Sequence, residues 1–433
     1  MSSSRIFKLG FMALFLLTLS VGCNENSSGS GDKEEVVELA FAYSGAEQTF
    51  NERFKEPVEK HFDHIVLKHI EAHPGNSEQL EEMIAKKNIP DLWITSTGSS
   101  TGMFQKELAY DLNEAFELVD FDLSRLEDNI VDEIRIRSNE FLDADSNILG
   151  ALPLKRGLSA LYYNKDIFDT FGVDYPEDHM TWDEVANLAS EVSGERNGDL
   201  YHGLHVHFHS AYTQHGVDHQ DENGHPQFDN EPAFRMTVDL MDKLFNIPGN
   251  YPVHPNELNE AFIDGDLAMH ATYDSTVTYV DAPFAWDIVT YPSWEHMPGL
   301  APTSNSDVIG ITNTSEHIEE AFRVIDYLLS DEYQTEFSKK GHASPLINEE
   351  VHAVFGEEEP AYQNIHVPSL FDMTPQKRSA NRFEIEHSLE AAGEPWHGRV
   401  FHDYYESDAT PPEFIRELQE RGEVVLKELE EKN

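Results

Sequence analysis

Strand-like and helix-like segments alternate along the chain after position 35, and this alternation constrains the fold more than any other sequence feature. Residues 36–42 and 65–70 are typical of strands, and residues 90–95 form a third short apolar run. Between them lie an amphipathic stretch at 48–62 and a helical pattern that begins after the capping residue Asn76. This alternation predicts an α/β layer with a largely parallel sheet.

Binding sites in such sheets lie beyond the carboxyl ends of the strands. Ser44 and Gly45 follow the first predicted strand, and Ser96 and Thr97 follow the third. We therefore expect these four residues to lie at a ligand cleft.

A second α/β unit is predicted to begin near residues 148–153 and to continue with a strand at 158–163. Thr181 and Glu184 have the spacing of a capping box, which predicts the start of a helix. A chain of this length is too long for one small core and is natural for two lobes. Further helices are predicted at 232–245, 255–263, 318–329 and 411–432, and further strands at 286–291 and 308–312.

Residues 1–22 are typical of a secretory leader, with a positive end followed by an apolar core at 9–19 that is too short for a permanent membrane span. The leader ends at Ser20-Val21-Gly22-Cys23, which resembles a bacterial lipobox. Cys23 is the only cysteine, so an intrachain disulfide is impossible. We expect lipidation at Cys23 and a flexible tether over residues 23–35. A plain secretory leader with an incidental cysteine is the alternative.

The chain is strongly acidic, with 30 Lys and Arg against 81 Asp and Glu and a formal net charge of −51. Such a field repels nucleic acid and anionic lipid head groups, so neither is an expected partner. Acidic residues occur in every segment, which indicates adaptation of the whole surface to salt or to high external pH. With 39% hydrophobic residues, the chain can still bury a core.

Four motif-bearing segments follow one another along the chain: Pro90-Asp91-Leu92-Trp93, the stretch from Ala151 to Glu184, residues 262–269 and residues 308–332. In this order they resemble the corresponding segments of bacterial extracellular solute-binding proteins of the sugar-type ABC transporter family. The resemblance implies two α/β lobes joined by crossing segments, with a ligand cleft between the lobes that closes about the hinge.

Matched segment by segment, the resemblance implies crossings near residues 147–152, 291–293 and 312–315. One lobe would hold residues 36–148 with 293–314, and the other would hold 149–292 with 315–433.

The same resemblance points to side chains that reach the ligand. The hydroxyls of Ser96 and Thr97 suit a sugar or another polyhydroxyl ligand, although an ordinary Ser/Thr turn is equally compatible. Lys155 and Arg156 follow the first crossing. Arg156 could bind a carboxylate or phosphate in bidentate fashion, which would favour an acidic sugar. A surface pair or a salt bridge across the hinge is the alternative for these two cations.

Many sugar receptors of this family place a Trp shortly after the segment that corresponds to residues 262–269, where it stacks on a sugar ring. Here Tyr273 is expected to stack, and Asp274 to accept hydrogen bonds from two ligand hydroxyls. Trp294 and Trp396 are alternative stacking platforms, and core packing is the competing interpretation for each.

Two other functions compete with solute capture. On one strand face, His205, His207 and His209 would suit a transition metal, with His215 and His219 beyond them, although no His-Glu-x-x-His motif occurs. A secreted glycoside hydrolase is less favoured, because abundant carboxylates form pairs by chance and no Gly-x-Ser-x-Gly elbow is present.

Taken together, the residues and the resemblance predict a binding protein and not an enzyme, with no cofactor and no resident metal. We expect a monomeric lipoprotein on the extracytoplasmic face of the membrane. It would capture a small polar solute and deliver it to an ABC permease. The expected solute is a carbohydrate, which would be an acidic one if Arg156 binds a carboxylate or phosphate.

Overall fold

The computed structural model describes residues 35–142, 147–217, 219–221, 223–252, 257–377 and 404–432. Residues 36–433 form one compact unit. The expected leader, the lipidation residue Cys23 and the candidate Trp396 lie outside the described residues. Within the described part of the chain, no helix is long and apolar enough to cross a bilayer.

The first sheet is the predicted parallel layer with one reversed strand. Strand β1 pairs in parallel with β2 and β3, whereas β12 is antiparallel to both β3 and β4. In spatial order the strands are β2 (Ile65–Glu71), β1 (Val37–Tyr43), β3 (Leu92–Ser96), β12 (Asp307–Ile311) and β4 (Leu152–Lys155).

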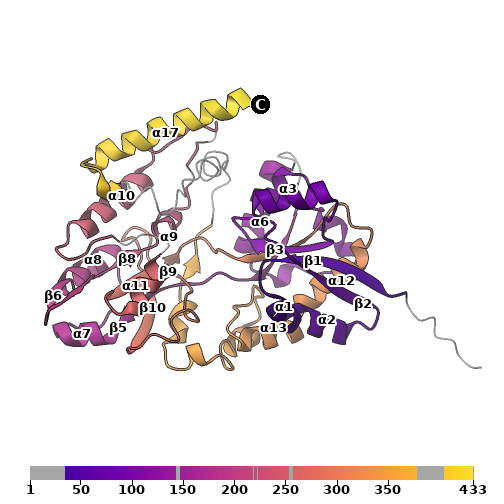
Figure 1. Cartoon of the computed structure of the whole chain (residues 1–433), viewed down its shortest axis with the longest axis horizontal. Helices are drawn as coiled ribbons and strands as arrows, with labels where there is room; N and C mark the ends of the chain where they lie inside the picture. Colours follow the sequence, from indigo (N-terminus) through magenta and orange to yellow (C-terminus); the bar gives the residue numbers. More distant parts are fainter. Residues whose placement is uncertain are drawn as a thin grey trace, which may run out of the picture. The chain divides into compact units, whose positions relative to one another are not determined.

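Helices lie on both sides of this sheet, as Figure 1 shows for α3 and α6 on one side and α1, α2 and α13 on the other. The predicted amphipathic stretch at 48–62 is α1, a π-helical turn and α2 in succession, and the side chain of Asn76 caps α3 by accepting from the Gln79 amide at 3.0 Å. The helices are α1 (Glu47–Phe50), the π turn (Asn51–Lys55), α2 (Glu56–His61), α3 (Ser77–Lys86), α4 (Thr101–Gln105), α5 (Phe116–Val119), α6 (Asp128–Phe141), α12 (Ile318–Leu328), α13 (Asp331–Lys339) and α14 (Glu349–Ala353), with 3-10 turns at Leu112–Glu114 and Leu123–Arg125.

The core of the first sheet contains Phe41, Trp93 and Phe104, all fully buried. Trp93 lies against Gly310 of β12, where a Cβ atom would stand 2.3 Å from the indole ring. Only glycine therefore fits opposite this tryptophan without a shift of the sheet.

The second sheet has the order β10-β5-β9-β8 and is mainly antiparallel, with only β8 and β9 parallel. Thr181 and Glu184 form the predicted capping box at the start of α8. The strands are β5 (Ser159–Asn164), β8 (His205–Val206), β9 (Met269–Tyr273) and β10 (Trp286–Thr290). The helices are α7 (Lys165–Phe171), α8 (Trp182–Glu191), α9 (Phe208–Thr213), α10 (Pro232–Phe245), α11 (Leu258–Asp264) and α17 (Pro411–Lys432). Two-stranded ladders join β6 (Gly194–Arg196) to β7 (Asp199–Tyr201) and β11 (Leu300–Ala301) to β13 (Thr374–Pro375), and 3-10 turns span Pro360–Tyr362 and Val367–Leu370.

Two clusters of buried side chains belong to this second sheet. One contains Trp182, Met241 and Tyr291, and the other contains Tyr162, Phe262 and Tyr279. Helix α17 packs on α10 in the first of these clusters through Phe414 and Leu418.

Core membership differs from the expected lobe division in three places. Residues 293–301 were expected in the first lobe, but Trp294 and Ala301 belong to the core of the second sheet. Strand β4 belongs to the first sheet, and α12 belongs to the first core, because its apolar face, including Phe322 and Ile325, packs beside β12. The expected second lobe, which would include residues 149–155 and everything after 315, therefore does not match the packing. The chain passes between the cores near residues 156–158, 302–306 and 340–344, and it returns to the first core at Leu346 and Val351 before Phe355.

Hydrogen bonds hold these three segments side by side. The Arg156 amide donates to the Ala343 carbonyl at 2.8 Å, and the Gly157 amide donates to Ser304 Oγ at 3.0 Å. A Cβ atom at Gly157 would lie 2.7 Å from the Asn305 backbone, so the segments meet where one of them has no side chain.

Candidate functional site

The candidate residues of the first sheet gather at one edge, as the strand directions predict. Strands β1, β3 and β4 end at this edge and β12 begins there, with Asp307 opposite both Ser96 and Lys155. Ser44 and Gly45 follow β1, and Thr97 follows β3. Their role in ligand binding stays a prediction.

The two hydroxyl candidates after β3 differ in their availability. Thr97 is 1% exposed, and its hydroxyl donates to the Ser306 carbonyl at 2.9 Å. Ser96 is half-buried, and its Oγ accepts from the Ser99 amide at 3.2 Å. The hydroxyl of Thr97 therefore holds β3 to the second crossing segment, whereas Ser44 is exposed beyond β1.

Arg156 forms an ion pair beside the hinge. Its Nη1 donates to Glu127 Oε1 at 3.0 Å, and its guanidinium lies 5.8 Å from the centre of the Phe371 ring. Arg156 is 8% exposed, and burial raises the pKa of the Glu127 carboxyl although the field of Arg156 acts in the opposite direction. The salt-bridge alternative thus describes Arg156, whereas half-buried Lys155 has no ion pair with a described residue.

Asp274 accepts hydrogen bonds from two hydroxyls, and both belong to the protein. Oδ1 accepts from the Tyr162 hydroxyl at 2.9 Å and from the Thr276 amide at 3.1 Å, and Oδ2 accepts from the Tyr362 hydroxyl at 2.7 Å. Burial and the nearby carboxylate raise the pKa of both tyrosines, which keeps them protonated as donors. The geometry gives Asp274 a structural role.

Tyr273 lies at the end of the second sheet that is next to the first crossing segment. It ends β9 opposite Ser159, and its ring centre is 5.6 Å from that of His207. Tyr273 and Arg156 line the same narrow pocket, so the structure brings together predicted residues from two segments. The pocket is also lined by Gly157, Leu158, Ser159, Ala301, Pro302, Thr303, Leu370, Met373 and Pro375.

Trp294 is a core residue that also borders a larger pocket. It is 7% exposed, its Nε1 donates to the Ala211 carbonyl at 3.1 Å, and its ring centre lies 6.0 Å from that of Trp182. Most of the Trp294 side chain is therefore packed in the core, as the alternative interpretation expected.

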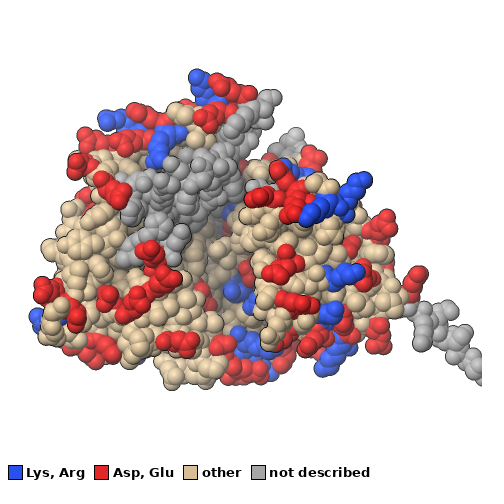
Figure 2. Space-filling view, in the orientation of Figure 1, with Lys and Arg blue, Asp and Glu red and all other residues tan. Residues whose placement is uncertain are grey.

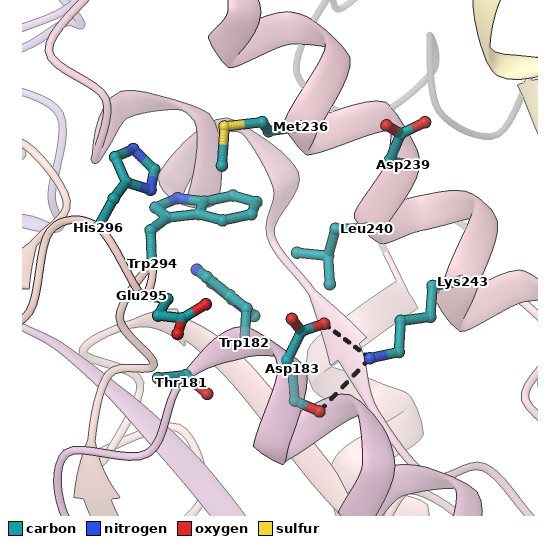
Figure 3. A pocket seen from close by; sticks show the side chains of 10 residues that line it. All are labelled: Thr181, Trp182, Asp183, Met236, Asp239, Leu240, Lys243, Trp294, Glu295 and His296. Atoms are coloured by element: carbon teal, nitrogen blue, oxygen red, sulfur yellow. Dashed lines mark hydrogen bonds and ion pairs between the residues drawn. The ribbon is translucent and has the colours of Figure 1, made fainter.

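The larger pocket has a volume of about 600 Å³ and is shown in Figure 3. Trp294, Met236 and Leu240 supply apolar walls, and the Lys243 ammonium donates to Asp183 at 2.7 Å. The other lining residues are Thr181, Trp182, Asp239, Glu295 and His296. None of these residues lines the narrow pocket beside the crossing segments.

The predicted histidine ligand face does not exist. Strand β8 covers only His205 and Val206, and His207 is the residue before α9, so the period-two spacing ends there. The His205 Nε2–H donates to the Tyr251 carbonyl at 2.9 Å, and burial lowers the pKa of His205 to about 4. No group of three metal-ligating side chains is present in the described ranges, which leave out the side chain of His209.

Sequence reasoning missed one contact at the edge of the first sheet. Arg53 Nη2 lies 3.0 Å from His342 Nδ1, and Arg53 Nη1 donates to the Tyr43 hydroxyl at 3.0 Å. No local spacing signals this contact, because Arg53 and His342 are 289 positions apart.

Two β-sheets, each covered by helices and each with its own core, are joined by three adjacent crossing segments. This arrangement defines the class of two-lobed solute-binding proteins. The chain belongs to the family described as bacterial extracellular solute-binding protein, whose profile matches residues 49–335. Membership places the protein outside the cytoplasm and identifies its family as one of binding proteins.

Several named proteins are similar to this chain. The arabinooligosaccharide-binding protein of Halalkalibacterium halodurans is 24% identical over 318 residues, which cover 67% of this chain and 70% of that protein. A binding protein from Brucella abortus is 23% identical over 220 residues, covering 46% of this chain and 51% of its own.

Solved structures share the fold at low identity. An ABC substrate-binding protein from Listeria monocytogenes in complex with cycloalternan has a TM-score of 0.68 and 17% identity, covering 91% of this chain and 100% of that one. UgpB from Mycobacterium tuberculosis, in complex with glycerophosphocholine, has a TM-score of 0.68 and 14% identity, covering 91% and 99%.

Proposed function

We propose that this protein captures a carbohydrate for uptake through an ABC permease. The observation that carries the proposal is the narrow pocket beside the crossing segments, where Tyr273 of the second sheet and Arg156 of the first crossing meet. The pocket has a volume of only about 10 Å³ in this conformation, so a sugar would enter it only as the two cores move apart. An aromatic ring and polar groups at such a position suit a sugar ring and its hydroxyls. The similarity to an arabinooligosaccharide-binding protein supports this class of solute.

Closure about the three crossing segments is the mechanism that we infer. The segments are bonded to one another at Gly157 and Ser304, so they provide a shared axis while each sheet keeps its own core. A solute that contacts both edges stabilises the closed form, because it binds that form more tightly than the open one. The permease would then dock the closed form.

Binding without turnover is part of the proposal. A glycosidase needs one carboxyl group as acid and another as base or nucleophile at the reacting bond. Asp274, the carboxylate at the edge of the second sheet, is already held by two tyrosine hydroxyls and a backbone amide. This arrangement favours a structural role for Asp274 and leaves capture as the function.

A thermal-shift screen of the purified protein tests the proposal. Neutral arabino- and malto-oligosaccharides, uronate oligosaccharides, sugar phosphates and divalent metals are compared, because a ligand that binds only the folded state raises Tm. A carbohydrate should raise Tm, and Tyr273→Ala should abolish the shift, whereas Tyr405→Ala, a change at a tyrosine that is 40% exposed, should retain it. A shift with metals alone, or release of sugar during incubation with an oligosaccharide, would overturn the proposal.

We also propose a lipid anchor at Cys23, on the lipobox-like sequence that precedes it. Expressed in bacteria with labelled fatty acid, the wild-type protein should carry the label and fractionate with membranes. Cys23→Ala should lose both properties, and a Cys23→Ala protein that still fractionates with membranes would contradict the anchor.

A further inference from the structure

An unusual group of cationic side chains lies beside the hinge of this acidic protein. Figure 2 shows that Asp and Glu are spread over the visible surface, as expected for 81 acidic against 30 basic residues. Arg53, Lys155 and Lys340 nevertheless all lie near one histidine, His342, and their positive charges lower its pKa. We call Arg53, Lys155 and Lys340 the hinge cations.

Arg53 is held in place by neutral partners. Nη1 donates to the Tyr43 hydroxyl at 3.0 Å, Nη2 lies 3.0 Å from His342 Nδ1, and the guanidinium stands 5.7 Å from the centre of the Phe337 ring. The side chain is half-buried. Among the described residues, no carboxylate forms an ion pair with Arg53, so its charge is oriented but not neutralised.

The two lysines are also unpaired. Neither Lys155 nor Lys340 forms an ion pair with a described carboxylate, although their neighbours Arg156 and Lys339 do. Asp307 lies opposite Lys155 in the β12–β4 ladder without forming an ion pair with it. These three cations therefore form no ion pair within the described part of the chain.

The pKa of His342 is affected by these neighbouring charges. Its pKa lies well below the ordinary value, first because the ring is buried and then because Arg53, Lys155 and Lys340 disfavour a further positive charge. The histidine is therefore neutral at pH 7, with three cations among its charged neighbours.

The hinge cations lie at the sheet edge that carries the proposed solute site. Lys155 is the last residue of β4, and Tyr43, which contacts Arg53, is the last residue of β1. His342 precedes Ala343, whose carbonyl accepts from the Arg156 amide in the first crossing segment. The group is thus adjacent to Arg156, one wall of the narrow pocket.

We propose that Arg53, Lys155 and Lys340 bind an oxyanion of the solute, so that the preferred ligand is a carbohydrate bearing a carboxylate or a phosphate. The inference rests on the proposed carbohydrate-binding function and names its substrate class. An arginine held in a fixed orientation offers a fork of donors to such a group, and the two lysines add point charges. Arg156 does not take this role, because Glu127 already neutralises it.

Isothermal titration calorimetry on the purified protein tests the inference at low and high salt. The titrants are a neutral oligosaccharide, the matching uronate oligosaccharide, a sugar phosphate and inorganic phosphate. The uronate or the sugar phosphate should bind roughly tenfold or more tightly than the neutral sugar, since charge-assisted hydrogen bonds are the strong ones. The difference should shrink as ionic strength rises.

Three variants assign the preference to the hinge cations. Lys155→Gln and Lys340→Gln should each weaken binding of the charged ligand several-fold and weaken binding of the neutral sugar much less. Arg53→Lys keeps the charge but removes the fork, and it should weaken the uronate as well. Lys60→Gln, at an exposed lysine of α2, removes the same charge elsewhere and should have no effect.

The outcomes separate this inference from the proposed function. Equal or tighter binding of the neutral sugar, with no effect of Lys155→Gln or Lys340→Gln, overturns the anion preference and leaves carbohydrate capture standing. Binding of inorganic phosphate that is lost in Lys155→Gln, without binding of any carbohydrate, supports the anion site and overturns the proposed carbohydrate. If neither carbohydrate nor phosphate binds, both proposals are wrong.

Discussion

Replacing Asp274 by alanine should destabilise the fold strongly, because the carboxylate is the shared acceptor of three donors. The change removes the acceptors of the Tyr162 and Tyr362 hydroxyls and of the Thr276 amide. Tyr162 keeps a contact of 2.9 Å with Thr276 Oγ1. Tyr362 keeps the Gly341 carbonyl at 3.5 Å, which is at the outer limit for a hydrogen bond, and the same Thr276 hydroxyl that Tyr162 contacts.

The magnitude follows from these contacts. A hydrogen bond to a charged group contributes about 1.5–3 kcal/mol, and a buried donor left without an acceptor costs about 1–3 kcal/mol. Since both tyrosines must then share the Thr276 hydroxyl, one of them is left poorly satisfied, and we expect Asp274→Ala to lower the free energy of unfolding by about 3–5 kcal/mol. Asp274→Asn keeps one acceptor oxygen and should cost about half as much.

Urea unfolding followed by fluorescence measures the change, with Asp281→Ala as the control. Asp281 is exposed, and its removal should shift stability by less than about 0.5 kcal/mol. A double-mutant cycle with Tyr362→Phe should recover part of the loss, because the orphaned hydroxyl is then absent. If Asp274→Ala unfolds like the wild type but no longer binds sugar, the structural role is refuted and the ligand role expected from the sequence is right.

Three further changes test the hinge and the buried histidines. Gly157→Ala should destabilise the protein by about 1–3 kcal/mol through overpacking, whereas Gly98→Ala, which meets nothing within 4 Å, should not; urea midpoints compare them. Glu127→Ala should cost about 3–5 kcal/mol in the same assay, because its buried arginine partner loses the counter-charge. His205 and His215 have folded pKa values of about 4, below the ordinary 6.5, so stability should be fully present above pH 6.5 and fall as the pH drops towards 4. Each should contribute on the order of 3 kcal/mol to this loss, and unchanged pH dependence in a His205→Gln variant would contradict its share.

Local signals predicted the regular elements closely. The capping box at Thr181 forms as its spacing indicates, and the helices at 232–245 and 411–432 have the predicted bounds. Such features depend on residues three or four positions apart, so they can be predicted from the sequence alone. The signal failed at His205–His209, where the strand stops after two residues and α9 begins.

The partners of individual site residues were not predictable in the same way. Arg156 could pair with a ligand or with a carboxylate, and only the fold brings Glu127 to 3.0 Å. Asp274 was expected to accept two hydroxyls, but the sequence did not indicate that Tyr162 and Tyr362 would supply them. These contacts join residues 29 to 112 positions apart, and no periodic pattern encodes such separations.

By itself, the sequence determined the α/β class, the likeness to extracellular solute-binding proteins, the acidic surface and the sheet edge at which polar residues collect. The tertiary structure decided which segments share a core, where the chain crosses between cores and which cations keep a free charge. Hydrophobic periodicity and capping act locally and leave a trace in the sequence. Core membership and ion pairing depend on distances between remote segments, such as Arg53 and His342, which are fixed only when the whole chain is packed.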